Sequence, residues 1–522
     1  MSGASEPAAV EAADMVDVAV VGAGPAGLSA TLEAASAGAS VALIDENAWP
    51  GGQLPKQIHQ FFGSRAHHAG TRGFHIAQRL VAQAEHYPNL AFLSDTVVYG
   101  LFPGLRLGLA ANGSSRELRA RAVILCTGAS EKSVAFPGWT LPGVMGAGAL
   151  QTLVNLHRVL PGHRVLMLGS GNVGLIVSYQ LLQAGAHMAA VVERAASVGG
   201  YAVHAAKLRR LGVPLLLRSE VSEVRGRDCV ESAVVRALDE TGRSIPGSER
   251  DFEVDLVCLA VGLSPLAELA WMAGCEFDYN AALGGHFPRH GDDLLTSVSG
   301  LYVAGDLAGV EEASIAMEQG KLAGISAARS LNLRVAGSRR RAAAAERLRE
   351  LRQQQEVPDT GRGFDAGPAL PEADRMREGP EAILDCTECI PCNPCESACT
   401  SKAIRVGRPV TNLPVLDPSR CTGCGRCISR CPGLAIVTVE LSGEGEDALV
   451  RVAYELLPRP LPGEAVAAVD AGGTVLARGE VLKVRIGHEG TPVVTVRVHR
   501  EVATQVRGIR TGTSMPSQAG ES

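Results

Sequence analysis

The sequence predicts an α/β protein that contains two strand–turn–helix units, followed by a cysteine-rich segment and a small β module. Two glycine-rich turns, Gly22–Gly27 and Gly169–Gly174, each follow an apolar run and precede a stretch with helical character. Nine of the thirteen cysteines lie between Cys386 and Cys431. Beyond them, apolar and polar residues alternate, which is typical of strands with one buried face. At 522 residues the chain can hold three or four domains.

Composition and charge exclude several classes of protein. The formal net charge of −6 argues against a nucleic-acid partner. No charged segment followed by an apolar run opens the chain, so we expect no secretion signal. The stretch 165–192 lacks Asp, Glu, Lys and Arg, but its glycines and Gln180 favour a buried strand, a turn and a helix. We therefore expect a cytoplasmic protein without membrane insertion.

The first unit has the parts of a dinucleotide-binding turn in the right order. Gly22 permits the turn, Gly24 lets a pyrophosphate approach the backbone, and Gly27 lets helix and strand pack closely. The strand expected at 41–44 ends in Asp45, 21 residues after Gly24, where a carboxylate can meet ribose hydroxyls. A glycine motif alone is weak evidence, but strand, glycines, helix, strand and acid together are strong evidence.

Three further segments indicate that the nucleotide is FAD. They are Gly51-Gly52-Gln53-Leu54, the strand that ends in Thr127-Gly128, and the strand that ends in Gly305-Asp306. With them, the chain resembles the two-dinucleotide-domain flavoproteins of the pyridine nucleotide–disulfide oxidoreductase superfamily. That resemblance implies that Asp306 holds the ribityl chain, and that the helix starting near Ala313 directs its positive N-terminus at the flavin. The implied FAD-binding residues are Gly22, Gly24, Gly27, Asp45, Gly52, Gln53, Thr127, Gly128, Asp306 and Ala313.

A second dinucleotide-binding unit is inserted into the first. An apolar strand leads to Gly169, Gly171 and Gly174, and the next strand ends in Glu193, 22 residues after Gly171. By the same resemblance this is an NAD(P)-binding domain. The acid favours NAD over NADP because it would repel a 2′-phosphate, although the adjacent Arg194 weakens that preference. A domain that binds another nucleotide, or no nicotinamide, is the alternative.

The cysteine-rich segment contains the spacing C-x2-C-x2-C-x3-C twice. The two runs, 32 residues apart, are Cys389, Cys392, Cys395 and Cys399, then Cys421, Cys424, Cys427 and Cys431. This spacing resembles that of two-cluster bacterial ferredoxins, in which the fourth cysteine of each run reaches the other cluster. It implies one [4Fe-4S] cluster on Cys389, Cys392, Cys395 and Cys431, and another on Cys421, Cys424, Cys427 and Cys399.

Other uses of these cysteines are less favoured. Structural zinc usually takes two separated pairs of ligands, which would not explain two triplets each followed by a cysteine. Disulfides are not expected, because nothing places the chain in an oxidising compartment. The first run departs from the pattern at Thr400, where the second run has Pro432. Cys386 has no assigned cluster, and a buried or free thiol is favoured over a competing ligand.

No catalytic residue is assigned from the sequence. The chain lacks the cysteine pair of disulfide reductases, both after Gly52 and around Gly169, so disulfide reduction is excluded. The remaining cysteines are isolated and are expected in the core: Cys126, Cys229, Cys258 and Cys275. Surface or packing roles are favoured over catalysis for the histidines nearest the flavin in sequence, which are His59, His67 and His68. Gln53 and Lys56 are candidates for tuning the flavin, by position alone.

The resemblance is strongest to one branch, the flavoprotein subunits of hydrogen cyanide synthase, opine oxidase and heterotetrameric sarcosine oxidase. It is carried by segments 137–144, 199–201 and 305–313 and covers roughly residues 16–330. Members of this branch oxidise amines or amino acids as assemblies. The resemblance therefore implies a hetero-oligomer with a second, amino-acid oxidase-like flavin subunit, and a small-molecule amine or NAD(P)H as the electron source.

These observations predict an FAD-dependent oxidoreductase subunit that passes electrons between FAD and two [4Fe-4S] clusters in an amine or amino-acid dehydrogenase complex. Flavin suits this position because it accepts a hydride and releases single electrons. One alternative is a self-contained NAD(P)H-dependent ferredoxin-type oxidoreductase. Another is an electron-wiring scaffold subunit whose own flavin meets no substrate.

The expected domain organisation follows from the positions of these motifs. It comprises a disordered N-terminus (1–15), an FAD-binding Rossmann-like domain in two segments (16–160 and 264–333), an inserted NAD(P)-binding Rossmann-like domain (161–263), a helical or flexible linker (334–383), a ferredoxin-like 2[4Fe-4S] domain (384–437), a small β module (438–510) and a tail (511–522). The β module carries no recognisable chemistry, so a docking or covering role is expected for it.

Overall fold

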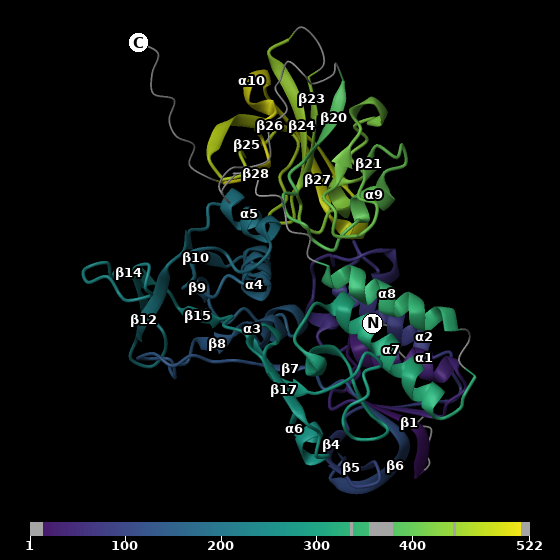
Figure 1. The fold of residues 1–522 in the computed structure, drawn as a ribbon. Helices are drawn as coiled ribbons and strands as arrows, with labels where there is room; N and C mark the ends of the chain where they lie inside the picture. The colour runs from purple at the N-terminus through teal and green to yellow at the C-terminus, as the bar shows by residue number, and fades with distance from the viewer. Residues whose placement is uncertain (1–13, 335–337, 354–378, 442–444, 513–522) are drawn as a thin grey trace. The chain divides into compact units, whose positions relative to one another are not determined.

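The computed structural model describes residues 14–334, 338–353, 379–441 and 445–512 (Figure 1). Most of the expected disordered N-terminus, tail and linker lies outside the described residues, although Met15 already belongs to a strand. Contacts divide the chain into two compact units. Unit 1 comprises Met1–Gln57, Gly73–Lys132 and Gly262–Gln353, and unit 2 comprises Ile58–Arg72, Ser133–Val261 and Gln354–Ser522.

Unit 1 is built on a seven-stranded sheet. Its order is β3-β2-β1-β6-β5-β4, and β19 pairs with β6. The strands are β1 (Met15–Val21), β2 (Val41–Ile44), β3 (Leu90–Leu93), β4 (Val97–Phe102), β5 (Arg106–Ala111), β6 (Ser114–Leu125) and β19 (Leu301–Val303). β1 runs parallel to β2 and β6, whereas β4, β5 and β6 form an antiparallel meander. β2 and the second half of β1 are buried on both faces, which explains why Val18–Val21 and Val41–Ile44 are wholly apolar.

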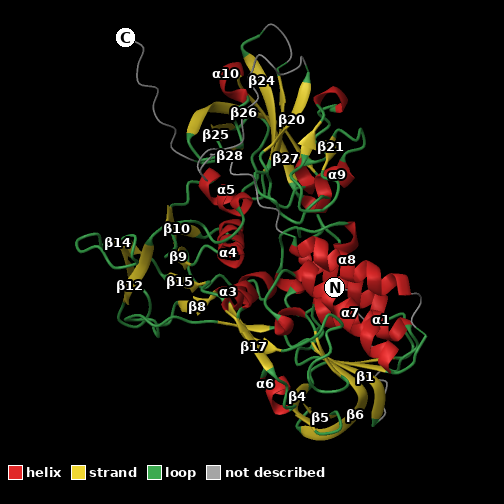
Figure 2. Cartoon of the chain, in the orientation of Figure 1, coloured by secondary structure: helices red, strands yellow, loops and turns green. Residues whose placement is uncertain are grey.

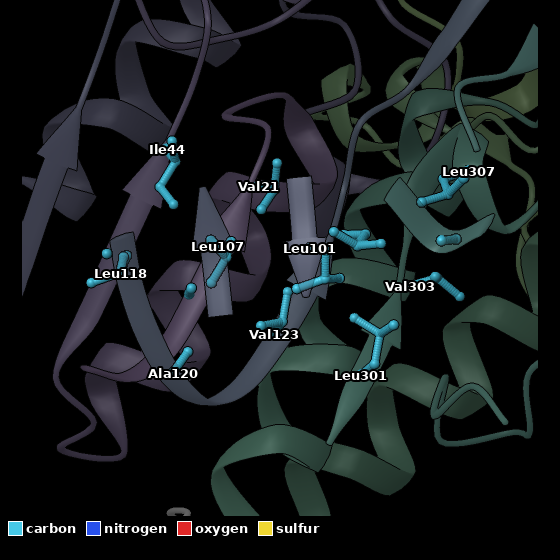
Figure 3. Packing of buried hydrophobic residues seen from close by; sticks show 14 of the residues in the cluster. Val21, Ile44, Leu101, Leu107, Leu118, Ala120, Val123, Leu301, Val303 and Leu307 are labelled. Carbon is cyan, nitrogen blue, oxygen red and sulfur yellow. The ribbon is translucent and has the colours of Figure 1, made fainter. Parts of the chain in front are cut away.

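Helices cover the parallel part of this sheet. They are α1 (Pro25–Ser36), α2 (Gly73–Ala84), α7 (Ala313–Ser330) and α8 (Ser338–Arg352), with the short α6 (Glu268–Met272) nearer β4. α1 and α7 touch backbone to backbone, because a Cβ at Gly320 or Gly324 would lie 2.1 or 2.3 Å from the carbonyl oxygen of Ala26 or Ala30. The other face packs into a core that includes Ile44, Leu107, Val123 and Leu301 (Figure 3).

Short antiparallel pairs complete unit 1. They are β7 (Ala129–Glu131) with β16 (Leu263–Pro265), and β17 (Phe277–Asn280) with β18 (Gly285–Pro288). The β7–β16 pair forms where the chain leaves unit 1 and where it returns.

The first part of unit 2 is a second parallel sheet, in the order β11-β10-β9-β15-β8. Its strands are β8 (Val144–Gly146), β9 (Arg164–Leu168), β10 (His187–Val192), β11 (Leu215–Leu216) and β15 (Leu256–Leu259). Its helices are α3 (Ala147–Gln151), α4 (Asn172–Gln183) and α5 (Ala202–Arg210). An antiparallel sheet of β12 (Ser219–Arg225), β13 (Ser232–Ala237) and β14 (Arg250–Glu253) is inserted before β15.

The rest of unit 2 is mostly strand, as Figure 2 shows. One antiparallel sheet has the order β20-β23-β24-β27-β26-β25-β28. Its strands are β20 (Pro380–Leu384), β23 (Ile436–Glu440), β24 (Asp447–Ala453), β25 (Ala465–Val469), β26 (Val475–Ile486), β27 (Pro492–His499) and β28 (Gly508–Arg510). The cysteine-rich segment lies between the paired strands β20 and β23, so its two ends are held together. It contains α9 (Pro394–Ala398), β21 (Ile404–Arg405) and β22 (Val415–Leu416), and α10 (Arg500–Ala503) follows β27.

The predicted fold class is confirmed, with two Rossmann-like sheets, a cysteine-rich ferredoxin-like segment and a C-terminal β module. Among the described helices, none has the length and apolar character needed to cross a membrane.

Candidate nucleotide and cluster sites

The first glycine loop lies where β1 ends and α1 begins. Gly22 has a φ of +98°, and a Cβ there would lie 2.2 Å from the carbonyl oxygen of Cys126. A Cβ at Gly27 would lie 1.8 Å from the carbonyl oxygen of Gly22. α1 starts with Pro25 and no described side chain caps its first turn, so its N–H groups can meet a phosphate.

Asp45 and Gly52 close around this loop. Asp45 Oδ2 accepts a hydrogen bond from the Ala23 N–H at 2.5 Å, and Asn47 fixes Oδ1 through its backbone N–H and its amide. Gly52 lies so near Gly24 that a Cβ on Gly52 would be 2.7 Å from the Gly24 Cα. The structure thus brings five predicted residues together at one loop, which are Gly22, Gly24, Gly27, Asp45 and Gly52.

Asp306 lies in the turn Gly305–Ala308, between β19 and α7. A Cβ at Gly305 would be 2.9 Å from the Cβ of Ala26, so this turn packs against the first turn of α1. Burial raises the pKa of Asp306 to about 6, although the Glu311 N–H donates to its carboxylate. A poorly solvated carboxylate is suited to accept hydrogen bonds from ligand hydroxyls. Ala313 begins α7, and no described side chain caps that helix.

The other predicted flavin residues have different surroundings. Thr127 donates its hydroxyl proton to the carbonyl oxygen of Leu266 at 2.6 Å, which ties the end of β6 to the returning chain. Gly128 follows it with a φ of +78°. Gln53 is exposed beside Gly52, and burial lowers the pKa of Lys56. These residues lie in unit 1 with the first glycine loop.

The second glycine loop, between β9 and α4, is built to the same plan. A Cβ at Gly169 would lie 2.3 Å from the Ala260 carbonyl oxygen, and one at Gly174 would lie 2.1 Å from that of Gly169. The carbonyl of Ser170 accepts from the Gly200 N–H, as that of Ala23 accepts from the Gly51 N–H. Both loops are therefore covered by a Gly-Gly pair that follows the acidic residue.

Glu193 is held beneath the second loop by defined contacts. Its Oε2 accepts from the N–H and the hydroxyl of Ser170 at 2.9 and 2.7 Å, and its Oε1 accepts from the Ala195 N–H at 2.9 Å. Arg194 forms an ion pair with Glu220. The cation that could have attracted a 2′-phosphate is therefore already partnered, a fact that the sequence did not reveal.

Four of the predicted cluster cysteines line one pocket. They are Cys399, Cys421, Cys424 and Cys427, the set expected if the fourth cysteine of the first run joins the second run. The Ala403 N–H donates to the Cys399 sulfur at 3.1 Å, a contact that stabilises a thiolate. We call this the outer pocket, because Cys424 is exposed there.

The remaining four cysteines form the inner set, which comprises Cys389, Cys392, Cys395 and Cys431. Burial and the nearby Cys431 raise the pKa of Cys395 to about 12, which indicates that the two sulfurs from different runs are neighbours. The Ala435 N–H donates to the Cys431 sulfur at 3.3 Å, matching the contact at Cys399. The outer pocket thus brings Cys399 to the second run, and Cys431 lies near Cys395 of the first run, while the full ligand set of each cubane stays a prediction.

Two findings concern other metal arrangements and the ninth cysteine. Within the described ranges, no three His, Cys, Asp or Glu side chains are placed to hold a single metal ion. Cys386 lies beside the inner set, where burial raises the pKa of its thiol to about 12 and the charge of Cys431 adds to the effect.

Helix α5 connects the second glycine loop to the inner set. The Glu388 carboxylate accepts a hydrogen bond from the Ala202 N–H at 2.5 Å, at the start of the helix. Lys207 Nζ donates to the carbonyl oxygen of Pro432 at 2.6 Å, and Arg210 Nη2 donates to that of Leu434 at 3.2 Å. Both cations are buried, with 4% and 7% of their surface exposed. Sequence reasoning missed them, because a helical Lys and Arg usually indicate a solvated face.

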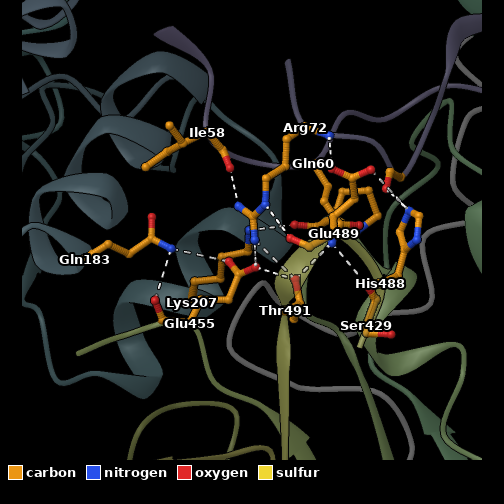
Figure 4. Close-up of polar contacts among 12 residues, drawn as sticks. Ile58, Gln60, Arg72, Gln183, Lys207, Ser429, Glu455, His488, Glu489 and Thr491 are labelled. Carbon is orange, nitrogen blue, oxygen red and sulfur yellow. Dashed lines mark hydrogen bonds and ion pairs between the residues drawn. The ribbon is translucent and has the colours of Figure 1, made fainter. Parts of the chain in front are cut away.

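Segment 58–72 also packs within unit 2, through a polar network (Figure 4). Arg72 forms an ion pair with Glu455 at 2.9 Å, and Thr491 donates to the same carboxylate at 2.7 Å. Gln60 donates to the carbonyl oxygen of Ser429 at 2.9 Å. Burial, with the charges of Lys207 and Arg72, lowers the pKa of the nearby His59 to about 3. His59 is therefore neutral at physiological pH.

Two protein families match this chain, and both agree with the geometry of the loops and the cysteine sets. The family described as pyridine nucleotide-disulphide oxidoreductase matches residues 16–320, and the one described as 4Fe-4S dicluster domain matches residues 388–435. The first match implies FAD and the second supports two [4Fe-4S] clusters. The cofactors are therefore FAD and two cubanes.

Curated proteins and solved structures that are similar to this chain include the following three. An opine oxidase subunit from Agrobacterium tumefaciens (strain Ach5) is 32% identical over 62% of this chain and 68% of that protein. Hydrogen cyanide synthase subunit HcnB from Pseudomonas aeruginosa is 29% identical over 59% of this chain and 69% of that protein. The thioredoxin reductase of T. acidophilum covers 61% of this chain and 100% of its own, with a TM-score of 0.50 and 22% identity, and shows the fold alone.

Proposed function

Because the chain belongs to the pyridine nucleotide-disulphide oxidoreductase family, we propose that it is the electron-transfer subunit of an amine or amino-acid dehydrogenase complex. The observation that carries the proposal is the presence, in one chain, of a flavin-type glycine loop and of a pocket lined by Cys399, Cys421, Cys424 and Cys427. When bound, FAD converts hydride chemistry into the single-electron steps that cubanes accept.

The chain's own residues have distinct roles in this proposal. The loop Gly22–Gly27 holds the pyrophosphate of FAD at the N-terminus of α1, and Asp45 holds the ribose. Asp306 would accept hydrogen bonds from the ribityl hydroxyls, and the positive N-terminus of α7 at Ala313 would favour negative charge on a bound flavin. The two cysteine sets hold the cubanes, with Cys399 and Cys431 as the exchanged ligands.

A multi-subunit setting is supported by the names of the relatives, which are subunits of an oxidase and of a synthase. The sequence also lacks a redox cysteine pair after Gly52 or beside Gly169, so electrons have no thiol route out of the flavin domain. We propose that a second, amino-acid oxidase-like flavin subunit oxidises the substrate and that this chain relays its electrons.

A second candidate function is supported by the intact second glycine loop. Glu193 lies under this loop, and Arg194 is engaged by Glu220, so the site favours NADH over NADPH. In this alternative NADH reduces the flavin directly, and the chain works as a self-contained NADH-dependent oxidoreductase.

Anaerobic rapid mixing separates the two functions. The purified holoprotein is mixed with NADH, with NADPH, or with a panel of amino acids, and flavin absorbance is followed. The proposed function predicts little reduction by either nicotinamide, and reduction by an amino acid only when the second flavin subunit is added. Rapid bleaching by NADH would support the second candidate. Rapid reduction of the isolated chain by an amino acid would contradict the relay and make the flavin pocket the substrate site.

A further inference from the structure

The two cysteine sets differ in how they meet the surface. Cys392 and Cys431 of the inner set pack against Val203, Ile390 and Ala435, beneath contacts from α5 and segment 58–72. The outer pocket has the exposed Cys424 at its mouth. Because electron transfer requires close approach, a separate protein can exchange electrons most directly through the outer pocket.

The two halves of the cysteine-rich segment also differ in charge. Residues 385–398 contain three acidic and no basic residues, whereas residues 399–430 contain six basic residues and one acidic residue. The whole chain carries a net charge of −6, so this second half is strongly basic against an acidic background. A surface of one charge around a redox centre favours docking of a partner protein whose surface carries the opposite charge.

The structure places these cations around the outer pocket. Arg426 lines it, and Arg420 immediately precedes Cys421. Arg485, from β26, has its Nη2 4.0 Å from the position of a Cβ on Gly425. All three are exposed, as are Lys402 and Arg405, which follow the pocket-lining Ser401 and Ile404 in the sequence. We define the basic face by five residues, which are Lys402, Arg405, Arg420, Arg426 and Arg485.

One acidic residue interacts with this face. Asp417 caps its own turn through Ser419, whose N–H and hydroxyl both donate to Oδ1. The pKa of Asp417 is lowered, first by its hydrogen bond from the Ser419 hydroxyl, and also by the charges of Arg420 and Arg405. This carboxylate therefore stays charged at neutral pH and offsets one of the five cations, which leaves the face clearly positive.

We propose that the basic face is the docking surface for an acidic electron-transfer protein, which exchanges single electrons with this chain through the outer pocket. One electron leaves the reduced chain and reduces one acceptor centre, with no proton or covalent bond transferred. Electrostatic attraction by the basic face increases the rate of association with the acceptor and positions the acceptor beside Cys424. The proposal rests on the cluster assignment in the proposed function and does not depend on which donor reduces the flavin.

The test uses the full holoprotein, reduced with dithionite under anaerobic conditions and freed of excess reductant. Its reoxidation by an acidic b5-type cytochrome and by a basic c-type cytochrome is followed at the haem absorbance in a stopped-flow instrument. We expect the rate constant with the acidic cytochrome to fall about tenfold or more as salt is raised from about 10 to 300 mM. With the basic cytochrome the rate constant should rise or stay level over the same range.

Reversing single charges tests whether the salt dependence of the rate constant comes from the basic face. Arg426→Glu should slow the acidic cytochrome about tenfold at low salt and flatten its salt dependence. The matched control is Arg227→Glu, which makes the same change at a side chain that is 90% exposed outside the cysteine-rich segment. If Arg426→Glu lowers the iron content, Arg485→Glu serves instead, because Arg485 lies on β26 outside the cysteine loops.

Two outcomes would overturn the proposal. One is a rate with the acidic cytochrome that is insensitive to salt, or that rises with it. The other is an equal effect of Arg227→Glu and the variants in the basic face, which would mean that only net charge matters. Because dithionite replaces the natural donor, neither outcome depends on amine oxidation or NADH.

Discussion

At the scale of single residues, Asp306 combines poor solvation with a position beside the first glycine loop. Its pKa of about 6 lies above the ordinary value of 3.8, so the folded apoprotein binds this proton more tightly than the unfolded chain does. The charged carboxylate therefore reduces stability, and the loss develops as pH rises from about 4 to about 6. A residue that weakens the empty protein but accepts hydrogen bonds from a ligand is characteristic of a binding site.

Replacing Asp306 is therefore expected to stabilise the apoprotein and to weaken its retention of FAD. In the apoprotein at pH 7, Asp306→Asn should raise the free energy of unfolding by about 1–2 kcal/mol after allowance for solvent screening, and the gain should vanish near pH 4. The same variant should retain less FAD after gel filtration, because an acceptor for the ribityl hydroxyls is lost. Denaturant unfolding and flavin absorbance measure the two effects, with the exposed Asp292→Asn as control. Full flavin occupancy in Asp306→Asn would contradict the assigned role.

Cys424 gives a second test at this scale. The anaerobically purified protein should contain about eight iron and eight acid-labile sulfide per chain. Cys424→Ser should remove about half of each and leave FAD bound, because Cys424 lines the outer pocket in unit 2, whereas the residues proposed to hold FAD lie in unit 1. Cys229 is exposed and not in the core as expected from the sequence, so Cys229→Ser is the matched control and should change neither value. Wild-type iron near four, or stoichiometric zinc, would contradict the two-cluster assignment.

At the scale of elements, α5 puts buried positive charge beside the inner cysteine set. Reduction adds one negative charge to a cubane, and Lys207 Nζ donates to the carbonyl oxygen of Pro432, the residue that follows the proposed ligand Cys431. We predict that Lys207→Met lowers the midpoint potential of the inner cluster, whereas Lys207→Arg leaves it near the wild-type value. A redox titration followed by EPR in the Cys424→Ser background observes the inner cluster alone. The exposed Lys132→Met is the control.

An unchanged potential in Lys207→Met would show that the lysine has only a structural role. Arg210→Met offers an independent variant, since Arg210 donates to the Leu434 carbonyl three residues after Cys431. A fall in potential in both variants, without loss of iron, is the expected outcome.

The elements that could be predicted from the sequence are those with a local chemical requirement. Gly22 and Gly169 have positive φ values and backbone atoms where a Cβ would be, so their type is dictated within a few residues. The cysteine spacing is equally local. By contrast, Lys207 and Arg210 have the spacing of an ordinary solvated helix face, and only tertiary packing buries them. Arg72 meets Glu455 383 residues away, and no local pattern encodes that pairing.

At the scale of the whole molecule, the fold class was predicted because each part is indicated by its own motif. The pairing of β20 with β23 was not predicted, because the entire cysteine-rich segment separates the two strands in the sequence. The same holds for segment 58–72, which leaves unit 1 after Gln57 and packs in unit 2. Within unit 2, such long-range contacts pack Cys392 and Cys431 against Val203, whereas Cys424 stays exposed.

The central claim is that electrons pass between FAD and the two clusters within this one chain. The most direct measurement is anaerobic illumination of the holoprotein with EDTA, which delivers electrons through the photoexcited flavin and needs no substrate. We predict that EPR signals of reduced clusters appear before the flavin is fully bleached, and that Cys424→Ser shows about half the signal. Complete bleaching of the flavin with no cluster signal would contradict the claim and leave the flavin and the clusters as separate systems.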